Sequence, residues 1–111
     1  MGTDSDAVWV KVDGQEVPAE GELARIKIAG RALVIAQMAG RLHALDDRCP
    51  HAGASLSMGQ IDEGKIVCAW HGRAYDPATG LCEGYQGVRP YAVEQRDEGV
   101  FVRIDDTAAA P

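Results

Sequence analysis

The 111-residue sequence has no apolar run approaching the ~20 residues that a membrane-spanning helix needs. Its N-terminal stretch, MGTDSD, is acidic and polar, whereas a secretory signal peptide begins with a basic and then an apolar segment. We therefore expect no membrane association and a cytoplasmic location.

Basic residues are also scarce. Eleven Lys and Arg stand against 17 Asp and Glu, which gives a formal net charge of −6. Nucleic-acid binding depends on Lys and Arg surfaces, so the charge excludes that class of function. The acidic surface has two interpretations, which stay open: it keeps the protein in solution, or it steers encounters with a basic partner.

Sustained helical periodicity is missing as well, and short apolar-alternating runs separated by glycine turns take its place. Residues 23–47 read as a three-stranded meander with turns at Ala29-Gly30 and Ala39-Gly40. Residues 91–95 and 100–104 read as a closing hairpin. The pattern predicts an all-β sandwich or small barrel. We expect one domain over residues 7–105, with residues 1–6 and 106–111 as loose tails.

Only three cysteines and three histidines are present, and four of these six residues form two close pairs. Cys49 and His51 lie in DDRCPHAG, and Cys68 and His71 lie in IVCAWHGRAYD. Each pair follows a predicted strand and sits among turn-forming residues, so two loops at one end of a β-structure can bring four ligands together. Without a secretory signal, a disulfide framework is not expected.

Three explanations account for these pairs. The first is coincidence, with buried cysteines acting as small apolar residues. The second is structural zinc, which suits two Cys and two His, although zinc sites usually separate a Cys pair from a His pair. The third is an iron–sulfur cluster with two kinds of ligand, in which two His replace two Cys on one iron.

The two loops resemble the C-x-H and C-x-x-H motifs of Rieske proteins, with residues 52–67 between them. The following HGRAYD and the turn PATG are also similar to that family, and the resemblance runs from about Leu42 to Val93. It implies a Rieske-type fold, with an antiparallel β-sandwich or barrel base and a small cluster-binding subdomain of two loops over about residues 46–85.

The same resemblance implies one [2Fe–2S] cluster. Cys49 and Cys68 would hold one iron, and His51 and His71 the other. Only His43 then remains, so the second iron site of a terminal oxygenase, built on two His and a carboxylate, cannot be made. We therefore expect no catalytic residues.

Family members of this size include ferredoxin components of bacterial multicomponent aromatic-ring dioxygenases. The resemblance thus implies a monomeric one-electron carrier that docks transiently with a flavoprotein reductase and a terminal oxygenase in aromatic hydrocarbon catabolism. Two alternatives remain: a small Rieske-like subunit of an assimilatory nitrite reductase, and a zinc-stabilised interaction module without redox activity.

The resemblance also predicts a low reduction potential. High-potential Rieske proteins carry a disulfide between the two loops, at positions that are Ala54 and Trp70 here, and a serine where this chain has Arg73. Because these stabilisers of the reduced state are missing, we expect a midpoint of about −150 to 0 mV, the lower part of the Rieske range. Protein-film voltammetry measures it directly, and a strongly positive midpoint would contradict the prediction.

Overall fold

The computed structural model describes residues 7–48, 55–69 and 72–105. These residues form an all-β fold with two short 3-10 helices, which confirms the predicted class. The elements, in chain order, are β1 (Ala7–Val12), η2 (Gly14–Glu16), β2 (Leu23–Ile28), β3 (Arg31–Met38), β4 (Arg41–Asp46), η3 (Leu56–Met58), β5 (Gln60–Asp62), β6 (Lys65–Val67), β7 (Ala74–Tyr75), β8 (Pro90–Tyr91), β9 (Val93–Arg96) and β10 (Gly99–Asp105).

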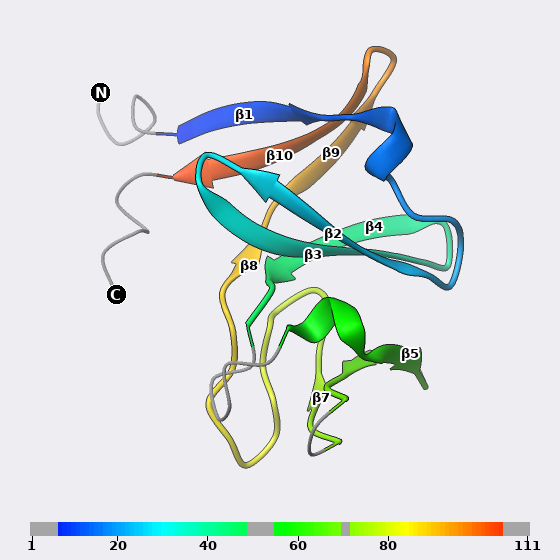
Figure 1. Ribbon diagram of the computed structural model, residues 1–111, viewed down its shortest axis with the longest axis vertical. Coiled ribbons are helices and arrows are strands. Elements are labelled where there is room, and N and C mark those ends of the chain that lie inside the picture. The colour runs from blue at the N-terminus through cyan, green and yellow to red at the C-terminus, as the bar shows by residue number, and fades with distance from the viewer. Residues whose placement is uncertain (1–6, 49–54, 70–71, 106–111) are drawn as a thin grey trace.

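The strands make three antiparallel sheets, ordered β1-β10-β9, β2-β3-β4-β8 and β5-β6-β7. Figure 1 shows the first sheet above the four-stranded sheet, and η3 with the third sheet below it. The first two sheets are the expected base. The third sheet belongs to the subdomain, which is therefore built on strands as well as loops.

The predicted meander over residues 23–47 is confirmed as β2, β3 and β4. Its two turns place Ala29 (φ 53°) and Gly30 (φ 79°), and then Ala39 and Gly40, in the left-handed region. Two successive residues with positive φ match the right-handed twist of a hairpin. The repeated Ala-Gly pair thus sets the register of the central sheet.

Strand β3 is buried on both faces, which explains its uninterrupted apolar run Leu33-Val34-Ile35-Ala36. Leu33 and Ile35 belong to a core shared with β1, β2 and β10, whereas Val34 and Ala36 belong to a second core that reaches into the subdomain. One strand therefore joins the base to the part of the molecule that carries the predicted ligands.

The prediction of a single strand over residues 91–95 is wrong in one respect. Tyr91 belongs to β8, which pairs with β4, whereas Val93 opens β9, which pairs with β10. Between them, the Ala92 carbonyl accepts a hydrogen bond from the Arg103 N–H (2.9 Å). The chain changes sheets at this point because each half of the run finds a partner on a different sheet.

Within the described ranges, no helix has the length and apolar character that a membrane crossing needs. The predicted tails, residues 1–6 and 106–111, lie outside the described residues, so the domain limits stay predictions.

Candidate metal centre

Of the four predicted ligands, the structure describes Cys68. Cys49, His51 and His71 lie outside the described residues. Cys68 directly follows β6 and is 1% exposed, within the second core, beside the fully buried Tyr75 and Leu56. Cys82, which lies outside both Cys/His pairs in the sequence, is buried in the same core. Burial keeps the Cys68 sulfur away from bulk water, as a cluster ligand requires.

The second ligand loop is the tip of the β6–β7 hairpin. The ladder pairs Val67 with Ala74, and one step further the Cys68 N–H donates to the Arg73 carbonyl (2.9 Å). The Gly72 N–H then donates to the Cys68 carbonyl (3.1 Å). The backbone on both sides of residues 69–71 is therefore fixed by hydrogen bonds.

The first ligand loop ends beside the second. Leu56 opens η3 with its side chain fully buried, and Gly59 follows η3 against β6. A Cβ on Gly59 would lie 1.9 Å from the Val67 carbonyl oxygen, so only glycine permits this approach. A cleft of about 400 Å³ lies between Met58 and Gly59 on one side and Cys68 and Gly72 on the other. The bases of the two ligand loops are thus in contact.

A third loop borders this end of the molecule. It begins at a turn in which the Asp76 carboxylate accepts the N–H groups of Ala78 and Thr79, and these bonds hold the pKa of Asp76 below its usual value. Its two ends meet where the Val88 N–H donates to the Gly80 carbonyl (2.8 Å). The predicted turn around PATG is confirmed, and it carries the chain back alongside the ligand loops.

Arg73 joins the second loop to the third. Its guanidinium carbon lies 3.8 Å from the centre of the Tyr85 ring, a cation–π geometry. Arg48, which directly precedes Cys49, is exposed. Both arginines lie close to the predicted ligands in the sequence, and two roles stay open for them: surface residues, or charges that raise the reduction potential of the cluster.

The remaining histidine, His43, is half-buried on β4, and burial together with the Arg41 charge lowers its pKa. Among the described residues, its cleft is lined by residues of β4 and β9, including Arg41 and Gln95. His43 therefore has the placement of a structural histidine on a sheet strand.

The residues fit an iron–sulfur cluster of the Rieske type. Two thiolates and two imidazoles are the donors that such a cluster takes, and each loop carries one of each. In the part of the chain that the structure describes, no three His, Cys, Asp or Glu residues gather as a metal site, because three of the four predicted ligands lie outside it. The buried Cys68 and the contact between the loop bases are the structural features that suit the cluster.

The sequence matches the Rieske [2Fe–2S] domain family over residues 8–97. The chain belongs to this family. A Rieske domain carries one [2Fe–2S] cluster, so this finding favours the iron–sulfur explanation of the paired loops over zinc and over coincidence.

Individual relatives fall into two kinds. The Rieske domain is 38% identical over 84 residues to the 3-chlorobenzoate-3,4-dioxygenase oxygenase subunit of Comamonas testosteroni, covering 74% of this chain and 19% of that protein. It is 32% identical over 101 residues to ferredoxin CarAc of Metapseudomonas resinovorans, covering 86% of this chain and 92% of CarAc. The chain thus spans a fifth or less of the length of several relatives, but nearly the whole length of this ferredoxin.

A solved structure gives the same picture. The fold matches a chain in the complex of reduced oxygenase and oxidized ferredoxin of carbazole 1,9a-dioxygenase, with a TM-score of 0.74 and 28% identity. The match covers 85% of this chain and 91% of the solved one. The fold is therefore that of a Rieske ferredoxin over nearly its whole length.

Sequence patterns did not single out Asp47, Ser57 or Gly59, although the structure places all three at the bases of the ligand loops. One sequence feature could have pointed to Asp47. Asp46 and Asp47 are two successive carboxylates at the end of an apolar strand, directly before a ligand loop.

Proposed function

We propose that this protein is a one-electron carrier whose [2Fe–2S] cluster is held by Cys49, His51, Cys68 and His71. The observation that carries the proposal is the end-to-end similarity to a ferredoxin, 92% of which is covered. All four residues of the Rieske ligand pattern are present in the sequence. When bound, the cluster accepts and releases one electron at a time.

The protein's own residues serve this role by holding and shielding the ligands. The hydrogen bonds between Cys68 and Arg73 and between Gly72 and Cys68 fix the backbone of the second loop. Leu56 and Tyr75, both fully buried, pack in the same core as Cys68 and keep water from its thiolate. A fixed ligand frame changes little between charge states, which favours rapid electron transfer.

The partners in this proposal are a flavoprotein reductase and a terminal oxygenase, and both dock at the ligand-loop end. Three large apolar side chains stand exposed there: Met58 (76%), Leu81 (67%) and Tyr85 (57%). Met58 and Tyr85 line separate clefts that share Gly72, so they flank the second ligand loop. Such carriers form small interfaces, below ~1,200 Å², that dissociate quickly. We propose a monomer in the cytoplasm, with no catalytic site of its own.

The direct test uses the purified protein under anaerobic conditions. We expect two irons and two acid-labile sulfides per chain, and visible absorption that dithionite bleaches. We also expect the protein to restore turnover when it is added to the reductase and terminal oxygenase of an aromatic-ring dioxygenase system from which the ferredoxin has been left out. A protein with the cluster that never restores turnover would contradict the carrier role.

Raising the ionic strength should slow this electron transfer. The chain carries a formal charge of −6, and salt screens the attraction of an acidic carrier to a basic docking face. We expect kcat/KM for the carrier to fall roughly tenfold or more between 0.05 and 0.5 M NaCl. Reduction by an uncharged mediator is the control and should change little. A rate that ignores salt would show that charge does not steer docking.

A second candidate comes from the similarity to a dioxygenase oxygenase subunit, of which this chain spans 19%. In that case the chain would act as the Rieske domain of an oxygenase. A small subunit of a nitrite reductase is a further alternative. Adding the protein to reductase-free oxygenase or nitrite reductase, and measuring which one it reduces, separates these roles.

A further inference from the structure

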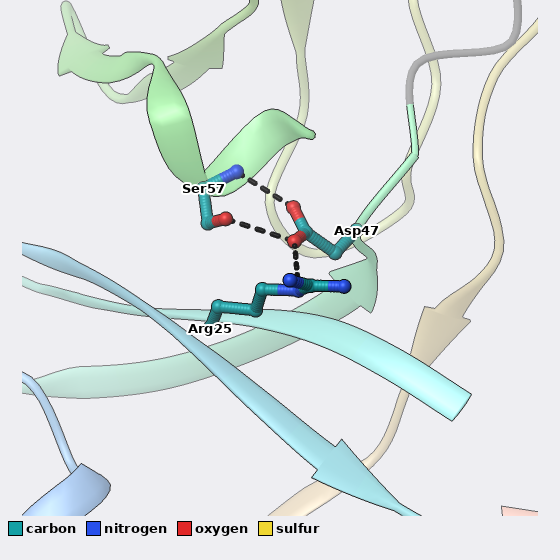
Figure 2. Close-up of polar contacts among 3 residues, drawn as sticks. All are labelled: Arg25, Asp47 and Ser57. Carbon is teal, nitrogen blue, oxygen red and sulfur yellow. Dashed lines mark hydrogen bonds and ion pairs between the residues drawn. The ribbon is translucent and has the colours of Figure 1, made fainter. Parts of the chain in front are cut away.

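The first ligand loop is closed at its base by three side chains, shown in Figure 2. Asp47 follows β4 directly before the loop, and Ser57 lies in η3 directly after it. The Asp47 Oδ1 accepts from the Ser57 N–H (2.6 Å), and the Asp47 Oδ2 accepts from the Ser57 hydroxyl (2.8 Å). Arg25, on β2, places its Nε 3.2 Å from the Asp47 Oδ2. We call Asp47, Ser57 and Arg25 the loop clip.

The loop clip stands out because its carboxylate is buried. The Asp47 side chain is 0% exposed, and Asp47 alone is a buried charged residue in the described ranges. Burying an ionised carboxylate is costly unless hydrogen bonds and opposite charge replace the lost water. Here both oxygens are occupied, and the Asp47 N–H also donates to the Ala32 carbonyl (3.0 Å). Both the side chain and the backbone of Asp47 are therefore held.

The two hydrogen bonds from Ser57 fix its orientation as well as its distance from Asp47. One carboxylate accepts both the backbone N–H and the hydroxyl of the same residue, so that residue cannot rotate without losing a bond. Ser57 is adjacent to Leu56, which is fully buried in the core that contains Cys68. The loop clip thus holds the two ends of the first ligand loop next to the core that contains Cys68, the cysteine of the second ligand loop.

The neighbouring aspartate offers a comparison. Asp46 lines the same cleft as Asp47 and Arg25, but its carboxylate accepts a hydrogen bond from the Tyr91 hydroxyl (2.7 Å), on β8. Asp46 is the last residue of β4 and Asp47 follows it, and the two carboxylates make different contacts. Asp46 ties β4 to β8, whereas Asp47 ties the start of the ligand loop to its end.

We propose that Asp47 is a positioning residue that, through Ser57, sets the geometry of the loop carrying Cys49 and His51. Arg25 places an opposite charge beside the buried carboxylate, with its Nε 3.2 Å from the Asp47 Oδ2. This inference rests on the proposed ligand assignment. It adds that the relative placement of the two ligand pairs is controlled by an ion-paired carboxylate outside the ligand set.

Two matched variants test the proposal in the cluster-loaded protein. Ser57→Ala removes a hydroxyl–carboxylate hydrogen bond at Asp47, and Tyr91→Phe removes one of nearly the same length at Asp46. Tyr91→Phe also removes the longer hydrogen bond that Arg31 donates to the Tyr91 hydroxyl (3.4 Å), so it is the more disruptive control. We expect Ser57→Ala to release iron to a chelator about tenfold faster, since a bond to a charged group is lost. We also expect shifted g-values in the electron paramagnetic resonance spectrum of the reduced protein, and a shifted midpoint potential. Ser57→Thr, which keeps the hydroxyl, should restore the parent values.

Tyr91→Phe should reduce stability to unfolding at least as much as Ser57→Ala while leaving the release rate, the g-values and the potential unchanged. Asp47→Asn is the stronger variant, because it removes the ion pair with Arg25, and it should release iron faster than Ser57→Ala. The proposal is overturned if Ser57→Ala and Asp47→Asn keep the parent's g-values and release rate, or if Tyr91→Phe alters them equally. Failure of the proposed carrier role would give a different result. The variants would still change the iron release rate and the g-values as expected, but the parent protein would pass no electron to any oxygenase.

Discussion

Replacing Cys68 with alanine is expected to abolish iron binding, whereas replacing Cys82 with alanine should leave the cluster in place. Both thiols are buried in the same core, at 1% and 7% exposure, so each substitution removes one sulfur from a similar apolar setting. The cavity left by either change is small and costs about 1 kcal/mol. A difference in iron content between the variants therefore reports ligation and not packing.

The measurement is iron and acid-labile sulfide per chain, together with visible absorption, in protein purified without oxygen. We expect about two irons per chain in the parent and in Cys82→Ala, and near zero in Cys68→Ala. Loss of the cluster should also lower the unfolding temperature, since metal binding stabilises the folded state. Full iron content in Cys68→Ala would remove Cys68 from the proposed ligand set, and equal loss in both variants would make the effect one of packing.

Replacing Gly59 with alanine is expected to destabilise the fold strongly. A Cβ there would lie 1.9 Å from the Val67 oxygen and 3.0 Å from the Val67 carbonyl carbon, both backbone atoms in or beside the β5–β6 ladder. Neither can rotate away, so η3 must move off β6. Overpacking of this kind costs about 3 kcal/mol, which corresponds to a fall in Tm of roughly 10–20 °C for a domain of this size.

Gly14→Ala is the control. No atom lies within 4 Å of a Cβ at Gly14, and neither Gly14 nor Gly59 has a positive φ, so the two variants differ mainly in space. We expect Gly14→Ala to change the free energy of unfolding by no more than about 0.5 kcal/mol. Thermal unfolding followed by circular dichroism measures both. Because Gly59 joins the two loop bases, Gly59→Ala should also purify with less iron, and a stable variant with full iron content would disprove this role.

Local sequence patterns predicted much of the fold because short-range rules govern those parts. Alternation of apolar residues and the Ala-Gly turns located β2, β3 and β4, since a hairpin turn and its flanking strands are neighbours in the chain. The proposed ligand residues also came from the sequence, because metal chemistry restricts the side-chain types and each pair lies within a few positions. The all-β class and the family followed from these two features.

Contacts between distant segments decided the rest. The division of residues 91–95 between two sheets depends on where β4 and β10 lie, which no local pattern of that segment encodes. Three further features likewise arise only when the sheets are packed together. They are the burial of β3 on both faces, the close approach of Gly59 to Val67, and the contacts of Asp47 with Ser57 and Arg25. The sequence by itself determined the family and offered the two Cys/His pairs that are the proposed cluster ligands. The tertiary structure decided how the loops carrying them are held, because side chains separated by ten or more residues meet only in the folded chain.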